Sequence, residues 1–198
     1  MTIVQIAIVY YSGSGITNSV AKLIAQGVEA FPENSCHLLR IQPEQVVNGR
    51  WKSDEILTKL SYSDGIIFGS PTYMGSVASQ FKAFMDATSE LWVSRQWKNK
   101  IAAGFTCCSS PAGDNLNSLI QLAVFAAQHG MLWVGQEEVP EKYVSGGNAD
   151  DANRLGSFLG LATQVTMGET LEQSLSGDHK TAKRFGERIA EMTKRVMS

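Results

Sequence analysis

The sequence of 198 residues predicts an α/β protein with a doubly wound parallel β-sheet and helices on both of its faces. Two observations support this fold class. Several short segments are almost continuously apolar, which is typical of strands buried on both faces, and each is followed by apolar residues at helical spacing. The alternation repeats five times, so we expect right-handed crossovers between parallel strands.

Five segments are expected to form the strands. Residues 3–11 read IVQIAIVYY, with almost no polar alternation, and residues 64–71 and 101–106 are similarly apolar. Residues 36–41 are more polar, as an edge strand would be, and residues 131–134 form the fifth strand. A long loop then leads to a strand continuation near residues 158–165.

The expected helices alternate with these strands. Apolar residues repeat at helical spacing over residues 20–31, 77–88, 116–128 and 182–196, and a modest helix spans residues 54–60. The helix at 116–128 is apolar on nearly all sides, so we expect part of it to lie at a subunit interface of a homodimer or homotetramer. The charged residues of the last helix, Asp178 among them, are expected on its solvated face.

Composition excludes several classes of function. Lys and Arg number 17 against 19 Asp and Glu, and the net charge of −2 argues against nucleic acid or an anionic membrane as partner. No apolar run approaches the roughly 20 residues that span a bilayer, and the N-terminus has no basic signal-peptide region. Three cysteines make no disulfide framework, and Cys36, His37 and His179 lack metal-ligand spacing. We expect a cytoplasmic protein without a metal, folded as one domain over residues 1–198.

Ligands of such sheets bind beyond the carboxyl ends of the strands. These ends are residues 12–17, 70–75 and 107–113, which are rich in small and hydroxyl side chains and contain no Lys, Arg or His. The adjacent Cys107 and Cys108 are either a redox-active pair or plain thiols.

The first of these loops, residues 12–17 (SGSGIT), presents hydroxyls directly before a helix, whose leading amides and dipole favour an anion. Hydrogen bonds worth about 1.5–3 kcal/mol each can hold a phosphate monoester there without a cation. A nucleotide-triphosphate loop is excluded because Lys22 lies well inside the helix. A dinucleotide fingerprint matches weakly, since Asn18 follows the glycines and the second strand ends at Arg40 and Ile41. A plain turn between strand and helix is the remaining alternative.

The motifs resemble those of flavodoxin-like proteins. Ser12-x-Ser14-Gly15-x-Thr17 after a buried strand resembles their FMN-phosphate loop, and residues 69–75 (GSPTYMG) with residues 81–86 (FKAFMD) resemble the second flavin loop of multimeric flavodoxins. Within that group the sequence is most similar to WrbA-type NAD(P)H:quinone oxidoreductases. The resemblance implies a five-stranded sheet of order 2-1-3-4-5, FMN as cofactor, and NAD(P)H as co-substrate.

The resemblance also implies the site residues. The FMN phosphate is expected at Ser12, Ser14, Gly15, Ile16 and Thr17, and the isoalloxazine against Pro71, Thr72, Tyr73, Met74 and Gly75 and against Cys107, Cys108, Ser109, Ser110, Pro111, Ala112 and Gly113. Three residues are expected near the substrate. Tyr73 stacks on the ring or gates it, Trp92 covers the open face or packs against Trp97, and His129 approaches the flavin of another subunit or interacts with its own helix dipole.

The resulting hypothesis is an FMN-dependent oxidoreductase that passes a hydride from NAD(P)H through flavin to a quinone-like acceptor. One alternative is a flavodoxin-type electron carrier; another is a flavin-binding regulatory protein with little turnover. Electron carriers use strongly acidic surfaces to meet basic partners, which a net charge of −2 does not supply.

Overall fold

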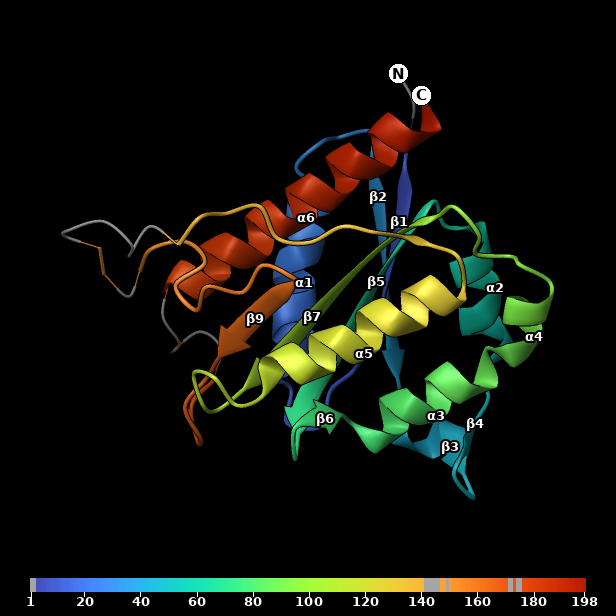
Figure 1. Ribbon diagram of the computed structural model, residues 1–198, viewed down its shortest axis with the longest axis horizontal. Coiled ribbons are helices and arrows are strands. Elements are labelled where there is room, and N and C mark those ends of the chain that lie inside the picture. Colours follow the sequence, from blue (N-terminus) through green and yellow to red (C-terminus); the bar gives the residue numbers. More distant parts are fainter. Residues whose placement is uncertain (1–2, 141–146, 149, 171–172, 174–175) are drawn as a thin grey trace.

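The computed structural model describes residues 3–140, 147–148, 150–170, 173 and 176–198 (Figure 1). Within these residues a seven-stranded sheet is formed by β1 (Gln5–Tyr11), β2 (Ser35–Ile41), β5 (Gly65–Tyr73), β6 (Ser76–Val77), β7 (Ile101–Cys108), β8 (Leu132–Trp133) and β9 (Leu161–Gln164). A separate hairpin joins β3 (Val46–Val47) and β4 (Arg50–Trp51). The parallel order β2-β1-β5-β7-β8 confirms the predicted sheet, to which the short β6 and β9 are added.

The fifth strand position consists of two pieces. Both β8 and β9 pair in parallel with β7, β8 along Ile101–Ala102 and β9 along Phe105–Cys108. The chain between them, residues 134–160, is therefore an insertion that interrupts one strand. This arrangement confirms the predicted strand continuation near residues 158–165.

The burial of the strands follows their composition. Almost every residue of β1, β5 and β7 is buried, because helices cover both faces of the central sheet. The more polar β2 lies at the edge and leaves His37 and Leu38 exposed.

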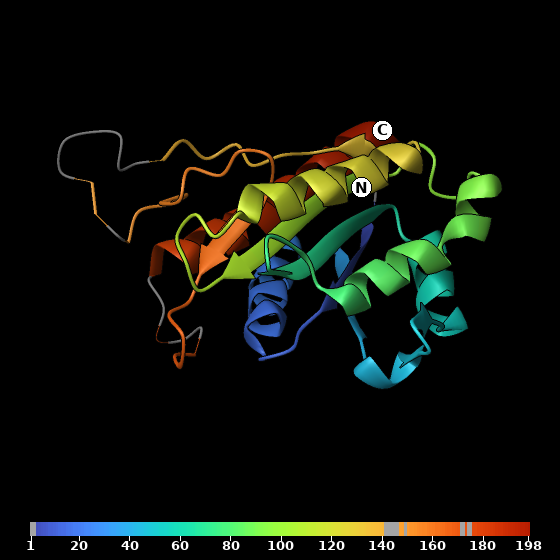
Figure 2. The same ribbon diagram turned by 60° about the horizontal axis from the view of Figure 1, so that its bottom comes forward.

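Six helices are found in the described chain: α1 (Ile16–Val28), α2 (Asp54–Tyr62), α3 (Ser79–Ala87), α4 (Ser89–Val93), α5 (Asn115–Gln128) and α6 (Ser176–Met197), with a 3-10 turn, η1 (Pro43–Gln45). One core cluster joins α1 and α6 to the sheet, and the other joins α2, α3 and α5 to its opposite face. Figure 2 shows α1 and α5 on opposite sides of β7. None of the helices in the described residues is long and apolar enough to cross a membrane.

Helices α1 and α6 cross through a pair of glycines. A Cβ built on Gly27 would lie 1.9 Å from the carbonyl oxygen of Lys183, and one on Gly186 would lie 2.1 Å from that of Ile24. The two backbones therefore touch, which requires glycine at both positions.

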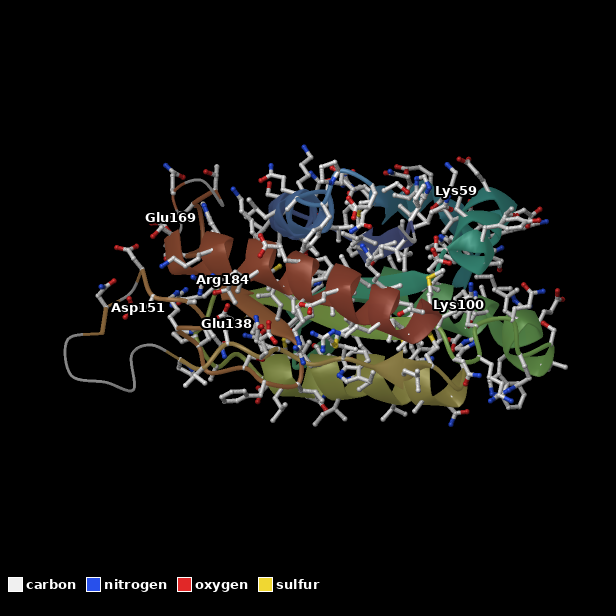
Figure 3. The ribbon with its side chains drawn as sticks, turned by 90° about the horizontal axis from the view of Figure 1, so that it is seen from above. Lys59, Lys100, Glu138, Asp151, Glu169 and Arg184 are labelled. Atoms are coloured by element: carbon white, nitrogen blue, oxygen red, sulfur yellow. The ribbon has the colours of Figure 1, made fainter. Side chains whose placement is uncertain are left out.

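The insertion is fastened to α6. Arg184 of α6 pairs with Glu138 at 3.1 Å (Figure 3), and the Thr181 hydroxyl accepts the amide of Asn153 at 2.8 Å. The expectation that Asp178 lies on a solvated face is wrong, because its carboxylate is buried against Arg154 of the insertion. The pairing of α6 with the insertion explains this burial.

Candidate functional site

A cavity of about 570 Å³ opens at the carboxyl ends of the parallel strands, within the size range of small-molecule sites. Four segments line it: Ser14 and Ile16; Pro71, Thr72 and Tyr73; Cys107, Cys108 and Ser109; and residues 165–169 after β9. Figure 1 shows β6 and the end of β9 at the same lower edge of the molecule. The three loops expected from the sequence are thus brought together.

The loop before α1 is shaped by Gly15, which begins the helix in a left-handed conformation with φ of 97°. The three hydroxyls of this loop have different partners. Ser14 faces the cavity, whereas buried Ser12 accepts the amide of Asn18 at 3.2 Å and Thr17 contacts the Cys107 sulfur at 3.1 Å. Because Ser12 accepts the Asn18 amide, the amides that precede Asn18 in the first turn of α1 are the donors left for a ligand.

Arg40, at the end of β2, supports this loop and was missed by the sequence analysis. Its guanidinium donates to the Ser12 carbonyl at 2.8 Å, and its buried Nε has no hydrogen-bond partner among the described residues. The register of β1 with β2, which pairs Tyr10 with Arg40, is the signal that would have placed it there.

The second loop is a tight hairpin between β5 and β6. Met74 and Gly75 both have positive φ, 49° and 76°, which is the pattern of a two-residue type I′ turn. Asn117 of α5 donates to the Gly75 carbonyl at 2.6 Å and holds the hairpin against that helix. As a result, the Met74 side chain is fully exposed at the hairpin tip.

Tyr73 crosses from this hairpin to the first loop. Its hydroxyl lies 2.6 Å from the position that a Cβ on Gly13 would occupy, so any larger residue at position 13 would displace the Tyr73 side chain. Burial, with a smaller contribution from Tyr11 and then Cys107, raises the pKa of the Tyr73 phenol. The phenol is therefore neutral at physiological pH, and its ring forms one side of the cavity.

A buried group of hydroxyls supports the cavity floor. Thr72 Oγ1 contacts the hydroxyls of Thr106 at 2.7 Å and Ser118 at 2.8 Å. These hydroxyls link two strands, β5 and β7, and one helix, α5, beneath the cavity.

The adjacent cysteines are separate thiols. Cys107 and Cys108 are consecutive residues of β7, so their side chains leave the strand in opposite directions, and both thiols are free. Burial, partly offset by the Thr17 hydrogen bond, raises the pKa of the Cys107 thiol to about 11. A neutral thiol of this kind is a poor nucleophile.

The rest of the third loop lies beside the cavity. Ser109 lines it, whereas Ser110, Pro111 and Ala112 are exposed. A Cβ on Gly113 would lie 2.5 Å from the Cys108 sulfur. Several of the expected flavin contacts are outside the cavity lining: Ser110, Pro111, Ala112 and Gly113 of this loop, and Ser12, Gly15, Thr17, Met74 and Gly75 of the other two.

The fourth wall, residues 165–169, was also missed. It includes Val165, Thr166, Met167 and Glu169, and follows β9 directly. The signal was present in the sequence, because the predicted continuation of the fifth strand has a carboxyl end at the same edge as the others.

Two predicted substrate residues lie outside the cavity lining. Trp92 is half-exposed on α4, and Trp97 packs in the core against Phe68, Phe125 and His129. His129 is a correction: only 2% of it is exposed, and its ring lies 4.4 Å from that of Trp97 between centroids. Such burial prevents His129 from approaching a flavin of another subunit. Within the described residues, no three His, Cys, Asp or Glu side chains gather as a metal site would require.

Comparison with known proteins decides the family. The family model for NADPH-dependent FMN reductases matches residues 6–143. The chain belongs to this family. It is 38% identical to flavodoxin FldP of Pseudomonas aeruginosa (strain UCBPP-PA14) over 92% of this chain and 93% of that protein. It is 31% identical to an NAD(P)H dehydrogenase (quinone) of Archaeoglobus fulgidus over 97% of this chain and 98% of that protein.

A solved structure supports the same assignment. The flavodoxin, a WrbA-like protein from Agrobacterium tumefaciens, superposes with a TM-score of 0.72 at 33% identity, covering 97% of this chain and 98% of its own. The fold of this FMN reductase family member is therefore flavodoxin-like.

Proposed function

We propose that this protein is an FMN-dependent oxidoreductase that passes a hydride from NAD(P)H through the flavin to a quinone or a similar flat acceptor. The observation that carries the proposal is the cavity at the carboxyl edge of the sheet, in a chain of the FMN reductase family, with the hydroxyl-rich loop before α1 at one of its walls. FMN, when bound, supplies the hydride chemistry, and the chain supplies the binding and orientation.

The residues at the α1 end fit a phosphate. Ser14 offers a hydroxyl to the cavity, and the first-turn amides of α1 with the helix dipole favour a dianion. Arg40 lies behind the Ser12 carbonyl and adds the positive charge that the loop itself lacks.

The other walls fit a flat heterocycle. Ile16, Val165 and Met167 provide apolar surface, and the β7 end provides backbone groups at Cys108 and Ser109. Tyr73 lies where it can contact the ring or limit access to it. Among the described residues, Glu169 is the only charged base that lines the cavity, as expected if the cofactor carries the chemistry.

A second candidate function is electron transfer between proteins, favoured by the 38% identity to a relative named flavodoxin. The two functions differ in how the bound flavin is reduced. Anaerobic mixing of the FMN-loaded protein with NADPH or NADH, followed by benzoquinone, separates them. Rapid bleaching by NADPH or NADH and reoxidation by benzoquinone indicate the enzyme. No bleaching by NADPH or NADH, together with a stable semiquinone when dithionite is added stepwise as the reductant, indicates the carrier.

The assigned phosphate loop has its own test. Replacing Ser14→Ala together with Thr17→Ala is expected to weaken FMN binding at least tenfold, because the loop loses the Ser14 hydroxyl that faces the cavity and the Thr17 hydroxyl that holds it against Cys107. Fluorescence titration of the apoprotein measures the affinity. Ser53→Ala is the matched control, since Ser53 caps α2 by accepting the Ile56 amide and is outside the cavity lining. Unchanged affinity in the double variant contradicts the assignment.

The proposal extends to the whole chain. Residues 1–198 act as one FMN-binding domain in the cytoplasm, where free cysteines stay reduced. The chain forms a homodimer or homotetramer through the exposed apolar side of α5, where Leu116, Ile120 and Val124 lie four residues apart.

A further inference from the structure

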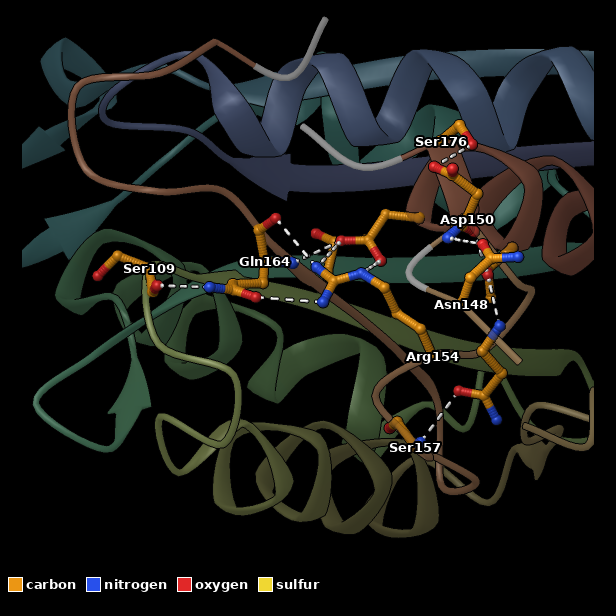
Figure 4. A network of polar contacts seen from close by, with 12 residues as sticks. Ser109, Asn148, Asp150, Arg154, Ser157, Gln164 and Ser176 are labelled. Carbon is orange, nitrogen blue, oxygen red and sulfur yellow. Dashed lines mark hydrogen bonds and ion pairs between the residues drawn. The ribbon is translucent and has the colours of Figure 1, made fainter. Parts of the chain in front are cut away.

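A buried ion pair links the insertion to α6 close to the cavity. The Arg154 Nε lies 2.8 Å from Asp178 Oδ1, and the two side chains are 9% and 3% exposed. The hydrogen bond within this ion pair runs from the Arg154 guanidinium to Asp178 Oδ2 at 2.9 Å (Figure 4). Apolar replacements often stabilise a fold at least as well as such a pair, so a contribution to stability does not by itself account for its presence.

Gln164, the last residue of β9, connects this pair to the cavity. Its side-chain oxygen accepts from Arg154 at 3.2 Å, and its side-chain nitrogen donates to the Ser109 carbonyl at 3.2 Å (Figure 4). The amide is therefore oriented by Arg154, since the guanidinium can only donate and thus fixes which end of the Gln164 amide faces Ser109.

The same carboxylate also fixes the fourth wall. Asp178 Oδ2 accepts the backbone amide of Gln164 at 2.8 Å, immediately before residues 165–169. One buried pair thus holds two cavity walls at once, the third loop through Ser109 and the fourth through the end of β9.

We propose that Arg154 and Gln164 are positioning residues for the ring-binding side of the cavity, and that the insertion contributes to the site through Arg154. This inference rests on the proposed function, because it assumes that a flavin ring lies against Cys108 and Ser109. Arg154 acts through Gln164, and the hydrogen bonds described for these two residues go to Asp178, to Ser109 and to each other.

The variant Gln164→Glu tests the proposal. Glutamate keeps the shape and the contact with Arg154 but has no N–H to donate to the Ser109 carbonyl. We expect FMN and riboflavin to bind about fivefold to tenfold more weakly, with an altered visible circular dichroism of the bound flavin. The thermal unfolding midpoint of the apoprotein is expected to stay close to that of the wild type, because the buried pair is intact.

Riboflavin separates positioning from charge, since it lacks the phosphate. Equal losses of affinity for FMN and riboflavin support the positioning role. A loss of affinity for FMN alone indicates repulsion between the added carboxylate and the phosphate, and it overturns the proposal. Unchanged affinity for both flavins also overturns the proposal. Gln45→Glu is the matched control, because its side-chain oxygen also accepts hydrogen bonds, from Gln42 and Trp51, outside the cavity lining.

Arg154→Lys provides an independent variant. Lysine keeps a charge opposite Asp178 but lacks the planar fork that reaches both Asp178 and Gln164. We expect a loss of the same kind for both flavins, and wild-type binding contradicts the role of Arg154. If the wild-type protein binds neither flavin, the proposed function itself fails. Loss of binding in the variants alone contradicts only the roles of Arg154 and Gln164 when it departs from the pattern given above, and leaves the proposed function standing.

Discussion

At the scale of single residues, His129 shows how burial sets a protonation state. Thr88 donates its hydroxyl to the Met85 carbonyl at 2.8 Å, so His129 Nε2 donates to Thr88 at 2.9 Å. Its Nδ1 is buried and, among the described residues, has no partner. Burial, and then the charge of Arg95, lower the pKa of His129 to about 4.

The lowered pKa predicts a loss of stability in acid. As the pH falls below about 6.5, His129 becomes protonated in the unfolded chain but stays neutral in the folded chain until about pH 4. The free energy of unfolding therefore decreases across this range. His129→Phe removes the titration. We expect urea midpoints of the wild type to fall more steeply between pH 7 and 4.5 than those of the variant, and parallel slopes would refute this explanation.

A local sequence pattern was enough to predict where the loops at the carboxyl ends of the strands lie, although the flavin contacts assigned to them stay predictions. The hydroxyls and glycines before α1 predict a loop at a helix N-terminus, and Ser14 and Ile16 of this loop line the cavity. Arg40 and Glu169 come from segments with no such pattern, and strand pairing brings them to this edge. His129 could not be assigned from sequence, because its surroundings, Trp97 and Thr88, lie 32 and 41 residues away along the chain.

At the scale of elements, the strands were predictable because burial on both faces leaves a continuous apolar run. The division of the fifth strand into β8 and β9 was visible as a weak second run. The hairpin of β3 and β4 was not, since strands of two residues are too short to show a period.

The crossing of α1 and α6 yields an element-scale prediction. Gly27→Ala and Gly186→Ala each place a methyl group against the backbone of the other helix. We expect a loss of about 1–3 kcal/mol in the free energy of unfolding for each, although alanine favours helix by up to about 1 kcal/mol. Urea unfolding measures the loss. The double variant should cost less than the sum, because the helices are already apart after the first change.

The control for this prediction is Gln26→Ala, beside Gly27 on the exposed side of α1. Its effect should stay within about 0.5 kcal/mol. Glycine variants as stable as the control would show that the two helices separate without cost.

At the scale of the whole molecule, α5 presents a surface that the monomer leaves uncovered. Leu116, Ile120 and Val124 are between 44% and 60% exposed and form one stripe along the helix. The opposite side of α5, with Leu119, Leu122 and Phe125, packs on the sheet, so the helix is apolar on both sides as the sequence indicated. An amphipathic surface helix would place polar residues on this outer face, and the net charge of −2 provides little repulsion between copies.

Association through this stripe is the prediction. Ile120→Glu combined with Val124→Glu places two negative charges on the stripe of each protomer. A two-fold interface would then bring four carboxylates together, and their repulsion favours dissociation. Light scattering at micromolar concentration is expected to give a dimer or tetramer for the wild type and a monomer for the variant. Lys22→Glu with Gln26→Glu, on the exposed side of α1, adds the same two carboxylates elsewhere and should leave the assembly intact. A monomeric mass for the wild type would contradict the proposed interface. If the wild type is oligomeric and the α5 variant has the same mass, the interface lies on another face of the protein.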